Sequence, residues 1–412
     1  MEIEPPRAEG WGSPRAACGV TPPEGQHLRP GEAGSAVVLE GGLSRRTLCL
    51  LGAGALLSPI ARAARTDPTL LAAWQSGAEQ HIGLLSVGDA SWSVQRSLSV
   101  PTRAHGLWAE AGGSVLAVAR RPGDWLLRWH PRTGQAQWHW IGEDRRFNGH
   151  VIASDGGATL WTTETDLDSA QGRLGVREAR TLEKTAEWAT HGMDPHQLLA
   201  LPQAVGELPA GTLMVANGGI PTLPETGRSK REIGRMDASL VALHPGTGAL
   251  LGQWRLPDPH LSIRHLAFDP VSGTLGIALQ AEHPASHPDP QAKAGAPVLA
   301  VWDGRTLRAA EGQPVMAGYG GDLCALPSAA GGGFAVSCPR VNQLALFDAR
   351  GRWRGALAHR EAYALASRDD RWWLSGAAGV LVGQGEASPV LALLDRPATA
   401  LQIDNHWVPV PG

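Results

Sequence analysis

The 412-residue chain lacks several features that would point to common functional classes. Lys and Arg number 36 against 39 Asp and Glu, so no basic excess for nucleic-acid binding is present. No stretch shows the periodicity of an amphipathic helix of normal length, and no apolar run is long enough to span a bilayer. Tyrosine and phenylalanine are scarce, whereas 16 tryptophans are present, which we attribute to core packing. These absences favour an all-β protein without nucleic-acid partners or an integral membrane span.

Common catalytic motifs are missing as well. The sequence has no Cys-x-x-Cys-His for covalent haem, no Gly-x-Ser-x-Gly elbow and no phosphate-binding glycine loop. Only four cysteines occur. Cys324 and Cys338 flank one hairpin, and counting back from its turn predicts that they lie opposite each other. Either a cross-strand disulfide or two buried thiols would fit that position.

The N-terminal part has the organisation of an export signal. Residues 1–43 are rich in Pro, Gly and Glu and are expected to be a disordered extension. Residues 44–63 combine the pair Arg45-Arg46, a short apolar run and Ala61-Arg62-Ala63, which is typical of a twin-arginine signal cleaved near Ala63. The extension is either a long n-region or follows from an unused upstream start codon. We therefore expect a periplasmic, monomeric mature domain over residues 64–412.

A histidine recurs at the start of a repeating unit in that domain. The four positions are Ala104-His105-Gly106, Gly149-His150-Val151, Pro195-His196-Gln197 and Arg264-His265-Leu266. Each opens an apolar stretch that ends in a turn with Asp, Gly or Pro. If each unit is one blade of a β-propeller, equivalent residues of successive blades lie at equal height around one axis. The histidines would then form a partial ring.

The second half of the unit supports the propeller interpretation. An apolar strand runs into a polar turn in which Gly supplies positive φ and Asp or His caps, as in Val241-Ala-Leu-His244-Pro-Gly-Thr-Gly248 and Val301-Trp-Asp303-Gly-Arg-Thr306. Two further units begin at Asp322 and Ala362 without the histidine. A seventh could combine residues 70–100 with residues 399–410 and so close the ring. We predict an all-β propeller, most simply seven-bladed, with six or eight blades as alternatives.

The ring of histidines is the first candidate site. Imidazoles that converge on an axis can hold a transition metal such as Fe, Cu or Zn, and Asp322 aligns with them in the next blade. The predicted ligands are His105, His150, His196, His265 and Asp322. The alternative is structural, because a shift of one residue along a strand would turn each histidine into the sheet. His191 could join either arrangement.

The second candidate site is an insertion over residues 217–239. It is polar and basic, and a long loop in a compact repeat usually has a function. We expect it to cover one mouth of the channel and to contact an anionic ligand, a haem propionate or an acidic partner, although a solvated loop is equally consistent. The candidate cofactor-binding residues in it are Asn217, Glu225 and Arg228.

Several motifs in the same order also resemble a known family. They are Phe147-Asn-Gly-His150, Thr162-Thr-Glu164-Thr-Asp166, His191-Gly-Met-Asp-Pro-His196-Gln-Leu198, Val215-Ala-Asn217-Gly-Gly-Ile220, Glu225-Thr-Gly-Arg228 and Ser262-Ile-Arg-His265-Leu-Ala267. Together they resemble the domain-of-unknown-function 1513 family over most of residues 70–382. The resemblance implies exported bacterial propellers of the YVTN/quinoprotein-like type. It also implies periplasmic iron handling, with imelysin-like and di-haem cytochrome-like proteins as partners.

We therefore expect a metal- or haem-associated binding or accessory protein of iron acquisition, and not an enzyme. Two alternatives stay open. One is a propeller enzyme, either a lactonase-like hydrolase or a quinoprotein-like oxidoreductase, which fold analogy alone supports. The other is a scaffold for protein interactions.

Overall fold

The computed structural model describes residues 67–88, 90–221, 232–377, 379–384, 392–394 and 401–411. All of them belong to one compact unit, Arg65–Gly412. The predicted extension, the export signal, Glu225 and Arg228 lie outside the described residues.

Five sheets of the unit each contain four antiparallel strands that follow one another in the sequence. The strands are β4 (Ala104–Ala109), β5 (Val115–Ala119), β6 (Trp125–Trp129) and β7 (Ala136–Trp140); β8 (Arg145–Ala153), β9 (Thr159–Asp166), β10 (Gln171–Glu178) and β11 (Lys184–Met193); β12 (Pro195–Ala200), β13 (Leu213–Asn217), β14 (Ser239–Leu243) and β15 (Leu250–Trp254); β16 (Leu261–Asp269), β17 (Thr274–Ala281), β18 (Leu299–Trp302) and β19 (Leu307–Ala309); and β20 (Leu323–Ala325), β21 (Phe334–Cys338), β22 (Gln343–Phe347) and β23 (Trp353–Ala358).

The sixth sheet joins strands from both ends of the described chain. Its order is β27-β26-β25-β24-β28-β1-β2-β3. The bounds are β1 (Thr69–Ser76), β2 (Glu79–Val87), β3 (Trp92–Val100), β24 (Leu365–Arg368), β25 (Arg371–Gly376), β26 (Gly379–Gln384), β27 (Ala392–Leu394) and β28 (Gln402–Pro409). The last strand pairs antiparallel with β1 and makes a single parallel bridge, Leu365 to His406, with β24.

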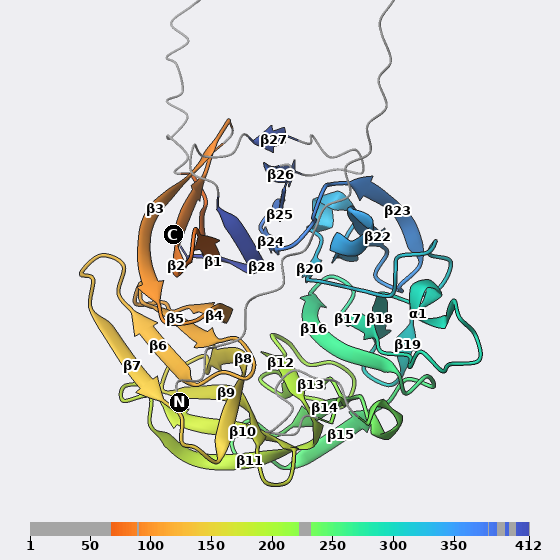
Figure 1. The fold of residues 1–412 in the computed structure, drawn as a ribbon, viewed down its shortest axis with the longest axis horizontal. Coiled ribbons are helices and arrows are strands. Elements are labelled where there is room, and N and C mark those ends of the chain that lie inside the picture. Colours follow the sequence, from red (N-terminus) through yellow and green to blue (C-terminus); the bar gives the residue numbers. More distant parts are fainter. Residues whose placement is uncertain are drawn as a thin grey trace, which may run out of the picture. The chain divides into compact units, whose positions relative to one another are not determined.

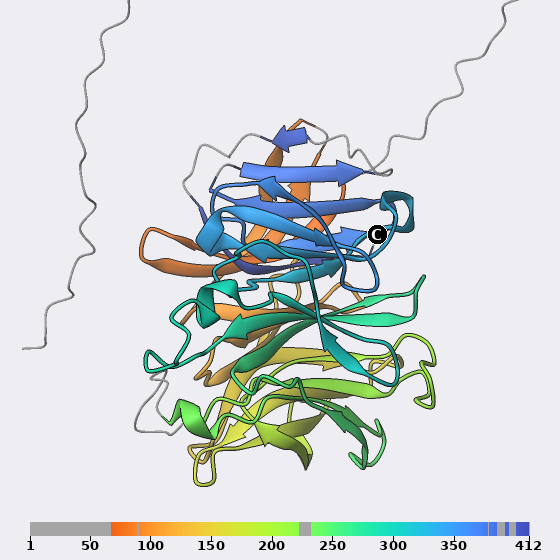
Figure 2. The same cartoon turned by 90° about the vertical axis from the view of Figure 1, so that its right-hand side faces the viewer.

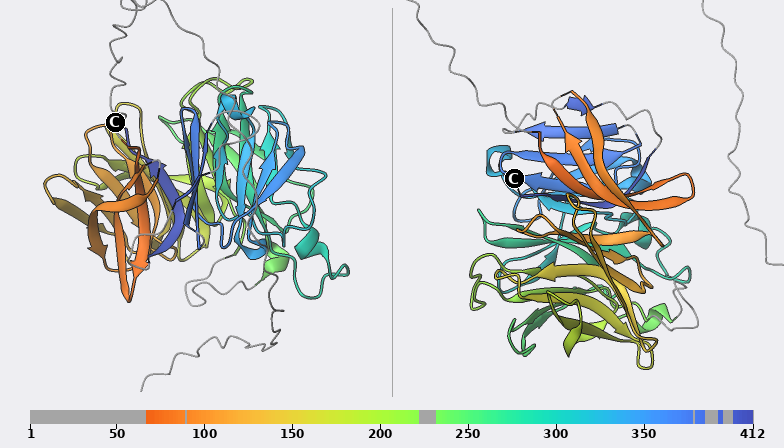
Figure 3. Two further views of the ribbon diagram at one scale, coloured as in Figure 1. Left: turned by 90° about the horizontal axis from the view of Figure 1, so that it is seen from above. Right: turned by 90° about the vertical axis from the view of Figure 1, so that its left-hand side faces the viewer.

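The sheets surround a common centre, as Figure 1 shows in the view down the shortest axis. Their first strands contact one another in succession, from β4 to β8, β12, β16, β20, β24, β28 and back to β4. Figure 2 shows the sheets from the side, and in Figure 3 the dark blue β28 lies beside the orange strands of the N-terminal part. The all-β architecture expected from the sequence is confirmed, and its radial sheets are consistent with a propeller.

Helices are nearly absent from the described residues, as expected. They comprise one short α-helix, α1 (Ala292–Gly295), and the 3-10 turns Ile233–Arg235, Ser328–Ala330 and Pro339–Val341. Within this part of the chain, no helix has the length and apolar character needed to cross a membrane.

The predicted turns between third and fourth strands are confirmed. Asp303 Oδ1 accepts hydrogen bonds from the amides of Arg305 and Thr306, and His244 Nδ1 accepts one from the amide of Gly246. Gly248 has a φ of 70°, so a residue with a Cβ would be strained there. These turns could be predicted from the sequence because they depend only on residues that are close together in the chain.

Apolar side chains fill the space between neighbouring sheets. In one cluster, Met214 and Leu240 of the third four-stranded sheet pack with Ile277 and Trp302 of the fourth, and all four side chains are fully buried. Trp125 is also fully buried, which agrees with the packing role expected for most tryptophans. Side-chain packing therefore holds neighbouring sheets together, alongside hydrogen bonds such as that from Thr163 Oγ1 of β9 to the carbonyl oxygen of His196 in β12.

The predicted pairing of the two cysteines is wrong. Cys324 lies opposite Ala335, and Cys338 lies opposite Gln343 on the next strand, so the two are not cross-strand partners. The 3-10 turn within the connection displaces the register that a simple count would give. Both thiols are free and buried, and burial raises the pKa of Cys338 to about 12. The alternative of two unreactive buried thiols holds.

Candidate metal centre

All four predicted ring histidines lie in irregularities of first strands. The pairing of β4 with β5 shifts register between Ala104 and Leu107, and His105 lies within that shift. Register shifts also occur around His150, His196 and His265 in β8, β12 and β16. A β-bulge re-aims a side chain that strict alternation would send elsewhere. The repeated bulge therefore gives these histidines a common direction.

The four rings meet in one cluster. One ring nitrogen from each of His105, His150, His196 and His265 lies within 4.8 Å of the corresponding atom of every other. His196 Nε2 lies 2.9 Å from His265 Nε2 and 3.4 Å from His105 Nε2. The structure therefore brings these four predicted residues together.

Sequence reasoning missed a fifth histidine. His406 of β28 packs with its ring centroid 4.4 Å from that of His265 and 4.6 Å from that of His105. It also lies in a register shift, since β28 pairs Ile403 with Trp74 but Trp407 with Ala72. Residues 399–410 were already assigned to the closing unit, so a search of that segment for a histidine could have found it. The repeat motif is not recognisable there because the strand lies at the end of the chain.

Two glycines allow the strands that carry the first two histidines to approach closely. A Cβ on Gly106 would lie 2.2 Å from the carbonyl oxygen of Gly149 and 2.7 Å from Cα of His150. A Cβ on Gly149, whose φ is 99°, would lie 2.9 Å from Cδ2 of His105. Glycine next to each histidine is therefore a packing requirement of the cluster.

Burial keeps these imidazoles neutral. Desolvation lowers the pKa of His105, His150, His196 and His265 well below the usual value, and the neighbouring histidines lower it further. A neutral imidazole presents a lone pair, which is the form that binds a metal. These four imidazoles can therefore act as metal ligands at pH 7 without first losing a proton.

Some nitrogens in the cluster have no hydrogen-bond partner within the described residues. His150 Nε2 and His406 Nε2 are buried atoms of this kind. An unsatisfied buried nitrogen is costly, and such groups in native proteins usually have an explanation such as an ion. The donor set suits Zn, Cu, Ni and Fe, so a transition metal fits these residues.

Asp322 lies behind the histidines. Its Oδ1 accepts from Nδ1 of His406 at 3.0 Å and from the amide of Leu323, while Oδ2 accepts from the amide of Leu365. It also forms a second group of possible donors with His265 and His406. The carboxylate is therefore beside the cluster, as the alignment of repeats predicted, and is engaged in three hydrogen bonds.

The second predicted site has a different character where it is described. Asn217 ends β13, is fully buried and donates from Nδ2 to the carbonyl of Thr190 and to Oγ of Ser239. Ser239 pairs directly with Asn217, so the insertion does replace a turn between two paired strands. His191 is exposed on β11 and does not belong to the histidine cluster.

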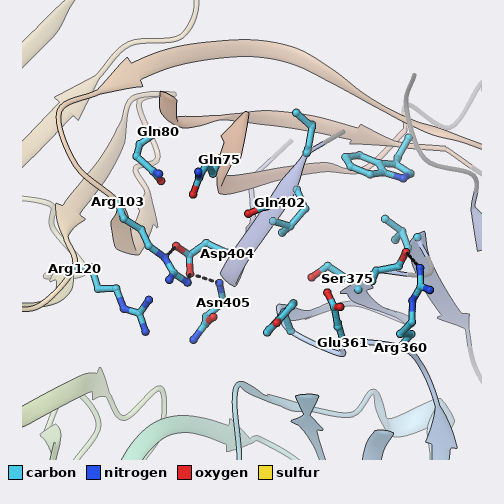
Figure 4. Close-up of a pocket in the computed structure, with 18 of the residues that line it drawn as sticks. Gln75, Gln80, Arg103, Arg120, Arg360, Glu361, Ser375, Gln402, Asp404 and Asn405 are labelled. Atoms are coloured by element: carbon cyan, nitrogen blue, oxygen red, sulfur yellow. Dashed lines mark hydrogen bonds and ion pairs between the residues drawn. The ribbon is translucent and has the colours of Figure 1, made fainter. Parts of the chain in front are cut away.

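A cavity of about 230 Å³ opens against three of the histidines. Its lining includes His105, His196 and His265 together with Arg120, Arg121, Asn148, Arg264, Gln280, Tyr319, Arg340 and Asn405. A larger cavity of about 780 Å³ shares Arg120, Tyr319 and Asn405 with it. Figure 4 shows the larger cavity, in which the Arg103 guanidinium pairs with the Asp404 carboxylate and Arg120 lies close by. The shared residues make the two cavities neighbours along one approach to the cluster.

Comparisons with known proteins place the chain in a family. No curated protein matches. A functionally unknown protein from Desulfotomaculum acetoxidans DSM 771 matches with 11% identity and a TM-score of 0.46, over 80% of this chain and 90% of that one. A chain in the crystal structure of a mitotic checkpoint complex matches with 11% identity and a TM-score of 0.51, over 76% of this chain and 84% of that one. At this identity the second likeness concerns the backbone fold alone.

The family comparison covers far more than the motifs quoted above. The model of the family described as protein of unknown function (DUF1513) matches residues 98–410, a segment that includes all five clustered histidines. The chain therefore belongs to the DUF1513 family.

Proposed function

We propose that this protein binds a transition metal ion at the five-histidine cluster formed by His105, His150, His196, His265 and His406. The single observation that carries the proposal is the convergence of five buried or half-buried imidazoles, each with one unpartnered ring nitrogen among the described residues, from five strands. Structural histidines normally pair each ring with local partners. Here the rings face one another, which is favourable when a cation lies between them.

In this proposal Asp322 positions a ligand and is not itself one. Its bond to Nδ1 of His406 fixes the tautomer that leaves Nε2 as the electron-pair donor. The arrangement has the form of the carboxylate–histidine–metal triads that raise ligand basicity. Its other hydrogen bonds, to two backbone amides, hold the carboxylate in place.

The same proposal includes a closed propeller of seven blades. The eight-stranded sheet would consist of two blades, β24–β27 and β28 with β1–β3, joined by the single bridge between their first strands. The succession of seven contacting first strands supports this division. Each of five blades would then contribute one histidine, and the remaining two would contribute Asp322 and Ala362 at the equivalent place.

The physiological role that we propose is binding or accessory function in periplasmic iron handling. The predicted twin-arginine signal supports the compartment, and the imidazole-rich donor set accepts Fe(II) as well as Cu and Zn. Imelysin-like and di-haem cytochrome-like proteins would be the partners. The hydrolase and oxidoreductase alternatives rest on fold analogy, to which the described residues add no separate support.

Metal analysis of the purified protein, followed by titration of the metal-free form with Fe(II), Cu(II) and Zn(II), tests the proposal. We expect one ion per chain. His196→Ala should weaken the affinity at least about tenfold, by analogy with the loss caused by removing supporting groups of metal sites. His244→Ala, at an exposed turn, is the matched control and should leave the affinity unchanged.

A purely structural cluster would behave differently. Removal of one ring would then lower the stability by roughly 1–3 kcal/mol through the unpaired groups left behind, without any change in metal affinity. That combination, or the absence of stoichiometric binding by the wild type, would overturn the proposal.

A further inference from the structure

The smaller cavity beside the histidines is strongly cationic. Four of its eleven lining residues are Arg120, Arg121, Arg264 and Arg340, and no described lining residue carries a carboxylate. Asp194, just outside the lining, pairs with both Arg121 and Arg264. Arg264 is buried and Arg120 and Arg121 are half-buried, so these three charges lose solvation and require a functional or structural reason, whereas Arg340 is exposed.

Arg264 is the most deeply buried of the four, with only 3% exposure. Its Nη1 lies 2.9 Å from Oδ2 of the buried Asp194. Arg264 shares this carboxylate with Arg121, and the buried Nε of Arg264 has no hydrogen-bond partner among the described residues, so a ligand with negative charge would satisfy it.

Arg340 is placed to contact such a ligand. Its guanidinium lies 4.2 Å from the ring centroid of Tyr319, in a cation–π contact that holds the planar group at the cavity wall. A planar guanidinium pairs with a carboxylate through two parallel hydrogen bonds. Arg340 therefore matches a carboxylate better than a spherical anion.

A bound metal would increase the excess of positive charge. Imidazole ligands carry no negative charge to balance the ion, so a divalent ion in their midst would add two positive charges beside the arginines. Since His105, His196 and His265 line the cavity, an ion in the cluster would be approached from the cavity side. The volume of about 230 Å³ admits a small organic anion.

We propose that this cavity, lined by Arg264, Arg340 and Tyr319, binds a small carboxylate that reaches the metal of the histidine cluster and pairs with the arginines. The contact between the carboxylate and the metal rests on the proposed function. The contact between the carboxylate and the arginines does not depend on the metal. A larger carboxylate ligand would extend into the neighbouring cavity of about 780 Å³ through the shared Arg120 and Asn405.

The test uses Co(II) as a spectroscopic probe in the full-length protein. Acetate is the carboxylate, and acetamide is a neutral control of the same size. Acetate should change the visible spectrum of bound Co(II) saturably, whereas acetamide should leave it unchanged. Equal responses to the two compounds would overturn the inference while the metal site stands.

Variants separate the arginine contact from metal binding. Arg340→Met should weaken acetate binding at least fivefold while it changes the Co(II) affinity less than twofold, and Arg340→Lys should keep more of the acetate affinity. Arg180→Met, at a side chain that is 80% exposed, is the control and should change neither value. An acetate affinity that is the same in Arg340→Met and Arg180→Met would also overturn the inference.

Failure of the metal site is detected separately. If Co(II) does not bind, the proposed function is overturned. The carboxylate site is then tested by comparing the melting temperature of the metal-free protein in acetate and in acetamide. A higher melting temperature in acetate that Arg340→Met abolishes would support the carboxylate site alone. No difference would overturn it.

Discussion

Four of the clustered histidines, His105, His150, His196 and His265, are held in the neutral form by their surroundings, and this makes the folded state sensitive to acid. Because burial lowers the pKa in the folded state, the unfolded chain binds more protons once the pH falls below about 6.5. The contribution to stability is therefore present above that pH and is lost below it. Each affected histidine changes the free energy of unfolding by about 1.4 kcal/mol per pH unit in this window.

We expect the metal-free protein to lose stability steeply between pH 6.5 and pH 5, as measured by urea unfolding at several pH values. Bound metal should move the loss to lower pH, since it competes with protons for the same nitrogens. His196→Ala removes one titrating group and should make the dependence shallower. A dependence identical in the variant and the wild type would show that His196 is not buried in its neutral form.

The glycine at position 149 gives a second prediction at this scale. Gly149→Ala introduces a Cβ that would lie 2.9 Å from the ring of His105, at a φ of 99°. Gly157→Ala is the control, because its φ is 66° but no atom lies within 4 Å of the new Cβ. Both should lower the melting temperature, whereas only Gly149→Ala should reduce metal affinity in the same titration. Equal metal affinities in the two variants would contradict the close packing of the cluster.

At the scale of the element, the bulged first strand is the unit that makes the site. The spacing of histidine from the following turn was visible in the sequence, since both belong to one hairpin. The bulge was not visible, because an extra residue in a strand leaves no signature when the partner strand is unknown. The direction of His105, which strict alternation left undecided, therefore required the structure.

Other features of the structure could not be predicted from the sequence for related reasons. The bond from His406 to Asp322 joins residues 84 positions apart, and nothing local to either one indicates it. The prediction that Cys324 and Cys338 lie opposite each other was wrong because a 3-10 turn in the connection changes the register of the hairpin. The turn caps at His244 and Asp303 were predicted correctly because the donor and the acceptor are separated by only two or three residues.

The contact between elements around Asp322 gives a prediction of its own. Asp322→Asn keeps the size of the side chain but weakens its hold on Nδ1 of His406, so metal affinity should fall about 10- to 100-fold. Asp303→Asn changes an exposed turn cap and serves as the control for general destabilisation. A reduced melting temperature with unchanged affinity in Asp322→Asn would assign the carboxylate a purely structural role.

At the scale of the whole molecule, β28 connects the two ends of the described chain. Deletion of residues 402–412 would remove the partner of β1 and expose the buried side chains of Leu70 and Leu71 along an open edge. We expect the truncated protein to melt at a lower temperature and to self-associate in size-exclusion chromatography. The full-length His406→Ala protein should elute at the same volume as the wild type and lose metal affinity, which separates the role of the strand from that of its side chain.

The donors of the cluster also have an order of synthesis. His105 is synthesised first of the five histidines and His406 last. A nascent or truncated chain can present four imidazoles but not the fifth, nor the carboxylate-oriented ring that β28 carries. Loading with metal would then mark molecules in which β28 has paired with β1. The ion would link segments some 300 residues apart in the chain. The entropy lost on closing a loop grows only slowly with loop length, so this long separation adds little to the cost of bringing the segments together.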